Sequence, residues 1–95
     1  MRSYRLTIGS RAAKELSTLP AAVAQRVDSA ILGLSGDPRP HGAKKLKGGR
    51  RLWRIRVGDY RVVYSIDDEQ AVVDVIGVPH VFQARVHPST LSPAF

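Results

Sequence analysis

Three arginines alternate with apolar residues in the segment 52–61, LWRIRVGDYR, and their spacing predicts a site for an anion. Gly58 and Asp59 match a two-residue hairpin turn, with glycine first as a type II′ turn prefers. A turn of this length places Arg56 directly opposite Arg61 and puts Arg54 on the same side of the two strands. Like charges that face each other across two strands destabilise a sheet. We therefore interpret the three guanidinium groups as a site for phosphate, which guanidinium binds in bidentate fashion.

An alternative role for these arginines is structural. The guanidinium groups could lie flat over the sheet and pair with Asp67, Asp68 or Asp74, since Asp74 is expected on the neighbouring strand. An exposed ion pair of this kind contributes under about 1 kcal/mol. The two interpretations differ in the partner of the arginines, which is a bound anion in one and a carboxylate of the same chain in the other.

The positive charge of the chain is concentrated in its middle. The whole sequence has 15 Lys and Arg against eight Asp and Glu, a net charge of +7. The segment 39–61 holds nine of these basic residues and one acid, so it carries +8 and the remainder carries −1. Repulsion within such a segment favours an anionic partner, and RNA is the first candidate. The alternative is a solvated face that only improves solubility.

A basic loop before the hairpin, HGAKKLKGGRR, adds cations at the rim of the expected phosphate site. Flexible cations of this kind suit contacts with a nucleic-acid backbone, which give affinity without sequence information. The loop lacks the GxxxxGK[ST] pattern of a nucleotide-binding P-loop. The expected RNA-binding residues are Lys44, Lys45, Lys47, Arg50 and Arg51.

Composition excludes several other classes of protein. There is no cysteine, so disulfides and thiolate metal sites are not available. The three histidines, His41, His80 and His87, are far apart and have no carboxylates at metal-ligand spacing, so we expect neither a metal nor a cofactor. No apolar run approaches the roughly 20 residues that cross a bilayer, and the amino-terminal segment lacks the apolar core of a signal peptide. We expect a cytoplasmic protein.

The elements that must position these residues follow from hydrophobic periodicity. Residues 4–8 alternate as a strand, a short helix follows from residue 10, and a second helix begins near Pro20 with apolar residues at helical spacing. Residues 39–49 are predicted to be a loop, and 52–57, 60–66 and 71–77 to be strands. Alternation turns Trp53, Tyr60 and Tyr64 inward and leaves Val63 exposed. The chain is thus a single α+β domain, 1–95, in the order β-α-α-β-β-β, with a small antiparallel four-stranded sheet and the helical hairpin on one face.

The sequence resembles the RelE/ParE superfamily of bacterial toxins. The stretches GAKKLKGG and LWRIRVGDYRVVYSIDDEQAVVDVIGV and the preceding helical hairpin carry the resemblance, which extends to about Gly77 and is most specific in RIRVGDYRVVYSID. The resemblance implies a small antiparallel sheet with two amino-terminal helices. It also implies one of two activities: the RelE branch enters the ribosomal A site and cuts mRNA without a metal, and the ParE branch poisons DNA gyrase. Toxins of both branches are held inactive by an antitoxin, which is usually acidic.

The resemblance also implies roles for single residues. Arg61 matches the family's hairpin arginine, Arg54 and Arg56 occupy strand positions where the family often has lysine, and Lys45 and Lys47 belong to its basic loop. RelE-like toxins also have an arginine and a tyrosine after the last strand, where this chain reads GVPHVF at 77–82. His80 is the only nearby group whose ordinary pKa, about 6.5, suits proton transfer. We therefore hypothesise that His80 is an acid or base beside the arginines; alternatively it is an ordinary tail residue.

Three functions are consistent with the sequence. The first is a ribosome-dependent mRNA endonuclease that leaves a 2′,3′-cyclic phosphate and inhibits translation, with ribosome, mRNA and an acidic antitoxin as partners. The second is a ParE-like inhibitor of DNA gyrase without nuclease activity, which the missing carboxy-terminal arginine and tyrosine favour. The third is a non-catalytic RNA-binding domain. In both toxin readings the antitoxin should bind across 39–61, with an affinity that falls as salt is added.

Overall fold

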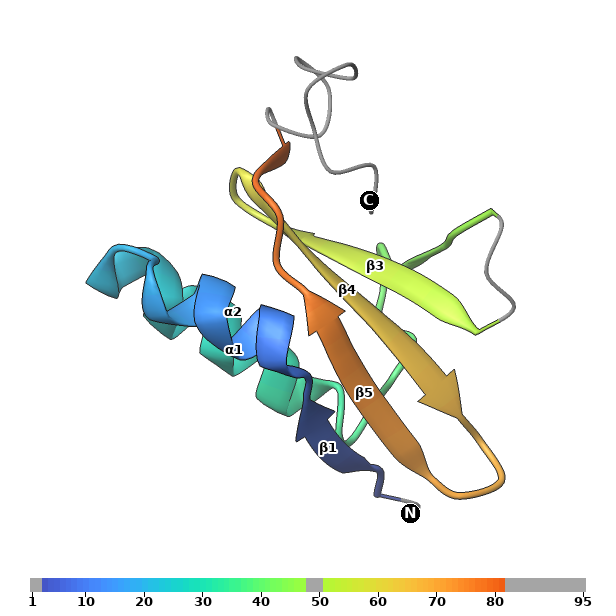
Figure 1. The fold of residues 1–95 in the computed structure, drawn as a ribbon. Helices are drawn as coiled ribbons and strands as arrows, with labels where there is room; N and C mark the ends of the chain where they lie inside the picture. Colours follow the sequence, from blue (N-terminus) through green and yellow to red (C-terminus); the bar gives the residue numbers. More distant parts are fainter. Residues whose placement is uncertain (1–2, 48–50, 82–95) are drawn as a thin grey trace.

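A computed structural model describes residues 3–47 and 51–81 of the chain. Two helices precede a meander of three strands, and both helices lie on the same face of the sheet (Figure 1). This confirms the predicted α+β class and the helical hairpin. The elements are β1 (Arg5–Ile8), α1 (Ser10–Ser17), α2 (Ala21–Gly33), β2 (Lys44–Lys45), β3 (Leu52–Val57), β4 (Tyr60–Asp67) and β5 (Val72–Gly77).

The sheet differs from the prediction in two respects. It has five strands in the order β1-β5-β4-β3-β2, because the two-residue strand β2 forms within the segment expected to be a loop. In addition, β1 pairs with β5 in parallel, from Arg5 opposite Val72 to Ile8 opposite Val75, so the sheet is mixed and not wholly antiparallel. Parallel neighbours need a long crossover connection. Here the helical hairpin and the other strands supply that connection, which local alternation could not reveal.

The β3–β4 hairpin has the predicted register. Arg56 lies opposite Arg61 and Arg54 lies opposite Val63, with Val57 and Tyr60 flanking the turn. Gly58 has φ +60°, and Asp59 is not among the residues with positive φ. This combination is the type II′ turn expected from a glycine in the first position. The turn length therefore determines which side chains of the two strands share a face.

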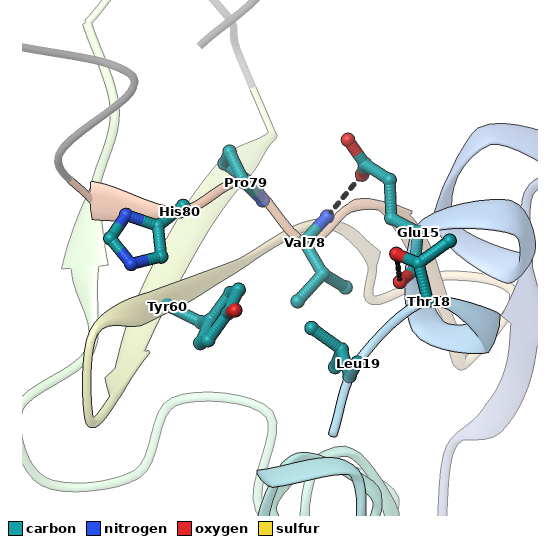
Figure 2. A pocket seen from close by; sticks show the side chains of 7 residues that line it. All are labelled: Glu15, Thr18, Leu19, Tyr60, Val78, Pro79 and His80. Carbon is teal, nitrogen blue, oxygen red and sulfur yellow. Dashed lines mark hydrogen bonds between the residues drawn. The ribbon is translucent and has the colours of Figure 1, made fainter.

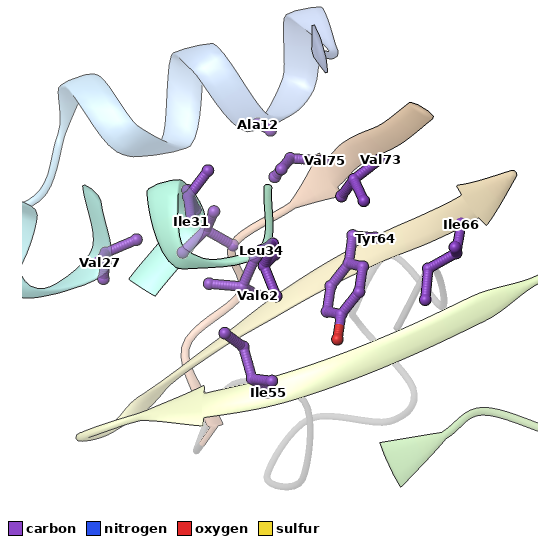
Figure 3. Packing of buried hydrophobic residues seen from close by; sticks show 11 residues of the cluster. Ala12, Val27, Ile31, Leu34, Ile55, Val62, Tyr64, Ile66, Val73 and Val75 are labelled. Atoms are coloured by element: carbon purple, nitrogen blue, oxygen red, sulfur yellow. The ribbon is translucent and has the colours of Figure 1, made fainter. Parts of the chain in front are cut away.

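The hydrophobic core lies between the helices and one face of the sheet (Figure 3). Side chains from both helices meet those of the central strands, and Tyr64 is the largest of the fully buried ones. Trp53 and Tyr60 pack against this cluster, which confirms that all three aromatic residues point inward. The buried members of the cluster are Ala12, Val27, Ile31, Leu34, Ile55, Val62, Tyr64, Ile66, Val73, Val75 and Val78.

Val63 was predicted to be exposed, and this prediction is wrong. Only 1% of its surface is accessible, although it is not part of the cluster under the helices. Val63 lies on a central strand with Arg54 opposite it on β3 and Gly77 opposite it on β5. A long arginine stem covers neighbouring apolar surface while its charged end stays in water. The alternation pattern showed the direction of this side chain but not the cover that its neighbours provide.

Side-chain hydrogen bonds hold the segment between α2 and β2 against the sheet. The Tyr64 hydroxyl donates to the carbonyl oxygen of Pro38 over 2.8 Å. Arg39 forms two hydrogen bonds with the carboxylate of Asp68, at 3.2 and 2.8 Å, and Tyr4 donates to the same carboxylate. These contacts bring the lysines of β2 to the edge of β3. Within the part of the chain that the structure describes, no helix is long and apolar enough to span a membrane.

Candidate nucleic-acid interface

The face of the sheet away from the helices carries the predicted arginines. Ile55 and Val62 are buried under the helices, so the alternating residues Arg54, Arg56 and Arg61 point to the other side. Arg56 is exposed, whereas Arg54 and Arg61 are half-buried. The structure therefore places the three arginines on one face of the hairpin, as the sequence predicted.

The strand β2 adds a fourth cation to this face. Lys44 pairs with Arg54 across the β2–β3 ladder, and directly opposed residues of antiparallel strands share a face. Lys45 pairs with Trp53 and therefore lies on the opposite face, toward the helices. We call the surface formed by Lys44, Arg54, Arg56 and Arg61 the arginine face.

Two of the remaining predicted RNA-binding residues, Lys47 and Arg51, are at the rim. Lys47 is exposed two residues after β2. Arg51 precedes β3 and forms an ion pair of 3.3 Å with Asp67, so part of its charge is compensated within the chain. Arg50 lies outside the described residues. The four loop cations that the structure describes are thus split between the two faces and the rim, and among these four Lys44 alone is placed on the arginine face.

The carboxylates considered as partners of the arginines are engaged elsewhere. Asp67 pairs with Arg51, Asp68 with Arg39, and Asp74 accepts a hydrogen bond of 2.6 Å from the Thr7 hydroxyl. The hydrogen bonds with Asp68 raise the pKa of Arg39. In residues 3–47 and 51–81, neither Arg54 nor Arg56 takes part in an ion pair. This arrangement favours an external anion over the structural alternative for these two side chains.

Two arginines of the face have defined local geometry. Arg56 Nε donates to the carbonyl oxygen of Gly58 over 2.8 Å, which fixes the direction of the side chain and leaves its two terminal nitrogens for a ligand. Arg61 has a buried Nε atom, and its backbone N–H donates to Pro79. A half-buried guanidinium is held in place by its surroundings and interacts more strongly with an anion than one in bulk water.

His80 is placed apart from the arginine face. It forms a β-bridge with Tyr60, and the two rings meet edge to face with centroids 4.9 Å apart. Tyr60 packs against the core under the helices, whereas Arg61, the next residue of β4, points to the opposite face of the sheet. The structure therefore does not bring His80 together with the three arginines, and the placement favours the alternative that it is not a partner in their chemistry.

The His80 ring instead lines a pocket of about 430 Å³ between α1 and the segment after β5 (Figure 2). On its far wall Glu15 accepts a hydrogen bond of 2.7 Å from the backbone N–H of Val78, which ties that segment to the helix. The residues that line the pocket are Glu15, Thr18, Leu19, Tyr60, Val78, Pro79 and His80.

Sequence reasoning missed two features of this region. Lys44 joins the arginine face through a strand of only two residues, which is too short to leave a periodic signal. Cζ of Arg39 lies 5.2 Å from the centroid of the Trp53 ring. Both residues line a pocket of about 320 Å³, together with Lys45 and Arg51. No spacing connects residues 39 and 53, so nothing local could have indicated this contact. Among the described residues no three His, Asp or Glu side chains are grouped as metal ligands.

Comparison with known proteins agrees with this architecture. The model of the family described as ParE toxin of type II toxin-antitoxin system, parDE, matches residues 6–84. Toxin RelE of Mycobacterium tuberculosis is 34% identical over 76 residues, covering 79% of this chain and 78% of the relative. The mRNA interferase toxin RelE of Escherichia coli is 33% identical over 78 residues, covering 80% and 81%.

A solved structure shows the same fold. A chain of the archaeal RelE-RelB complex from Pyrococcus horikoshii superposes with a TM-score of 0.75 at 31% identity, covering 83% of this chain and 96% of that one. The family match spans both helices and the whole meander, including the hairpin that carries the arginines. The chain therefore belongs to the ParE toxin family of type II toxin–antitoxin systems, in the RelE branch of the RelE/ParE superfamily.

Proposed function

We propose that this protein is the toxin of a toxin–antitoxin pair and acts in the cytoplasm as a ribosome-dependent mRNA endonuclease. The observation that carries the proposal is the arginine face, on which Arg56 and Arg61 stand opposite each other with Arg54 and Lys44 beside them. Relatives about a third identical in sequence are named RelE toxins and mRNA interferases. An mRNA in the ribosomal A site would supply the phosphate that this surface is proposed to bind.

The proposed reaction needs no metal and leaves a 2′,3′-cyclic phosphate. The 2′-hydroxyl oxygen attacks the adjacent phosphorus, the bond from phosphorus to the 5′-oxygen breaks, the 2′-hydroxyl proton leaves to solvent, and the 5′-oxygen takes up a proton. Negative charge gathers on the phosphoryl oxygens in the transition state, and fixed cations stabilise it. We assign this role to Arg54, Arg56 and Arg61, which act through charge and hydrogen bonds, since arginine does not give up its proton.

The basic rim is assigned to binding and not to chemistry. Lys44, Lys45, Lys47, Arg50 and Arg51 would contact RNA phosphates and contribute affinity that depends on salt. The distribution of Lys44, Lys45, Lys47 and Arg51 over two faces and an edge suits a ligand that curves around the β2–β3 edge, as ribosome-bound RNA can. His80 is not assigned a step, because its ring lies on the helix side of the sheet.

An antitoxin is the second proposed partner. A relative from Pyrococcus horikoshii is known in a RelE-RelB complex. The counterpart here would be an acidic segment that covers the positive region 39–61 and blocks the arginine face. Its affinity should fall as salt is added. A complex that is insensitive to salt would show that the contact is mainly apolar.

A second candidate function is a ParE-like inhibitor of DNA gyrase without nuclease activity. The observation that favours it is the sequence GVPHV at 77–81, which lacks the arginine that RelE-like toxins have after the last strand, together with the displacement of His80 from the arginines. The two functions predict different damage in cells that express the protein: mRNA cut in the A site, or broken DNA.

The decisive experiment measures cleavage of mRNA on purified ribosomes, using protein that was either untreated or first treated with a chelator that is then removed. The wild-type protein should cut within the A-site codon, leave a cyclic phosphate and be unaffected by the treatment. Arg61→Ala should lose at least a hundredfold in rate, as does removal of one transition-state donor in other enzymes. Arg11→Ala, a change on the exposed part of α1, is the control and should retain the rate. Intact mRNA with the wild-type protein would refute the endonuclease.

A further inference from the structure

The tip of the β3–β4 hairpin meets a charged side chain from α2. Gly58, with φ +60°, is the first residue of the turn. A Cβ atom at this position would lie 3.5 Å from Nη1, 3.8 Å from Nη2 and 3.9 Å from Cζ of Arg26. All three are atoms of the guanidinium group, which therefore lies beside Gly58 at ordinary van der Waals distance from that position. The positive φ of the turn, and not a close approach of Arg26, is what favours glycine here.

The position of Arg26 follows from the way α2 packs. Val27 and Ile31, one helical turn apart, are buried against the sheet. Arg26 immediately precedes Val27 and is exposed, so it stands at the flank of the buried stripe. From this flank its side chain reaches the end of the hairpin. The packing of α2 thus places the Arg26 guanidinium beside the turn, although α2 itself lies on the face of the sheet opposite to the arginine face.

Two guanidinium groups therefore converge on one glycine. The Arg26 guanidinium lies 3.5–3.9 Å from the position that a Cβ atom of Gly58 would occupy, and Arg56 donates from Nε to the carbonyl oxygen of the same residue. Asp59 is the one carboxylate in the turn, and in the described residues no ion pair joins it to either arginine. Two cations at one point repel each other unless an anion lies between them. Within residues 3–47 and 51–81 no carboxylate forms an ion pair with Arg26 or Arg56, so the hairpin tip has the charge of an anion site.

We propose that Arg26 and Arg56 bind a backbone phosphate of the RNA at the hairpin tip, in addition to the phosphate on the arginine face. The inference rests on the proposed function, because it takes RNA as the ligand. The strand would run along the arginine face and pass over Gly58 toward α2. Arg56 belongs to both positions, since its Nε is fixed on Gly58 and its terminal nitrogens are available to a ligand. Contacts of this kind hold the RNA in register without reading its bases.

The test measures the affinity of the purified protein for a fluorescent single-stranded oligouridine between about 50 and 200 mM KCl. Removal of one phosphate contact lowers the slope of log affinity against log salt by about 0.7 for a single strand. Arg26→Gln should show this lower slope and bind about three- to tenfold more weakly at the lowest salt. Arg26→Lys, which keeps the charge, should recover most of the slope.

The matched control is Arg11→Gln, which removes an exposed arginine from α1 and should leave the slope unchanged. Thermal unfolding of each variant verifies that the exposed substitutions leave the fold intact. If Arg26→Gln has the same slope and affinity as Arg11→Gln, the hairpin-tip site is refuted.

Cleavage on ribosomes separates this inference from the proposed function. Loss of cleavage in Arg61→Ala together with an unaltered salt slope in Arg26→Gln would refute the hairpin-tip site alone. A lower slope in Arg26→Gln, with no cleavage by the wild-type protein, would support the hairpin-tip site and refute the endonuclease.

Discussion

Tyr64→Phe removes one hydroxyl from the centre of the molecule and leaves the ring in place. Tyr64 has no exposed surface, and its hydroxyl donates to the carbonyl oxygen of Pro38, a residue that is itself buried. In the variant this carbonyl loses its partner in a region with little access to water. A buried acceptor without a partner costs about 1–3 kcal/mol. We therefore expect the free energy of unfolding to fall by about 2 kcal/mol.

Urea and thermal unfolding measure this effect. In a domain of this size a loss of 1 kcal/mol lowers Tm by about 4–8 °C, so the expected decrease is about 8–16 °C. Tyr60→Phe is the matched control, because Tyr60 is half-buried and its hydroxyl makes no hydrogen bond with the described residues. It should cost less than about 0.5 kcal/mol. Equal losses in the two variants would refute the argument from the buried hydrogen bond.

The pH dependence of the free energy of unfolding is a second test of the burial of Tyr64. Burial raises the pKa of Tyr64 to about 12, whereas tyrosine in an unfolded chain has a pKa of about 10. Between these values the unfolded chain releases a proton that the folded protein keeps, so the stability of the wild type falls as pH rises. The whole shift corresponds to roughly 2–3 kcal/mol, and Tyr64→Phe lacks this loss. The difference in stability between the two proteins should therefore close between about pH 10 and pH 12, and a constant difference would contradict the burial argument.

Two further predictions concern the faces of the sheet. Arg56→Met, Arg61→Met and the double variant form a double-mutant cycle, measured by urea unfolding. The coupling free energy between Arg56 and Arg61 should be repulsive, at about 0.5 kcal/mol, because the two like charges lie directly opposite each other. The coupling should shrink in about 0.5 M NaCl, and an attractive coupling would contradict the assigned facing. His80→Ala should leave the rate of RNA cleavage on ribosomes unchanged, because its ring contacts Tyr60 on the helix side. A decrease of more than about tenfold in the cleavage rate would show that His80 takes part in the reaction.

The hairpin shows how much local pattern can determine. Alternation from Trp53 to Tyr64 and a two-residue turn with glycine first are properties of neighbouring residues, and together they specify register and facing. The opposition of Arg56 and Arg61 therefore follows from the sequence, as does the inward direction of the aromatic side chains. The α+β class follows in the same way, from a helical period in one half of the chain and an alternating period in the other.

Other features depend on contacts between residues far apart in the chain. The parallel pairing of β1 with β5 joins Arg5 to Val72, and β2 follows a segment that hydrogen bonds of Tyr64 and Arg39 connect to the rest of the fold. A segment of two residues has no period, so Lys44 could not be assigned to the arginine face in advance. The burial of Val63 depends likewise on the strands to either side of it.

The candidate site likewise has features that local sequence predicts and features that depend on tertiary contacts. The chemistry of the site depends on arginines that have no carboxylates at matching positions of the hairpin. Residue types and their spacing are enough to predict this, because the pairing of two neighbouring strands preserves that spacing. Which residues belong to the site depends on tertiary packing. His80 pairs with Tyr60, whose side chain points to the face opposite the arginines. Arg26 lies beside Gly58 because α2 packs on the core. Alternation specifies the side of a strand on which a residue lies, but which distant residue lies beside it depends on how helices and strands fill the core together.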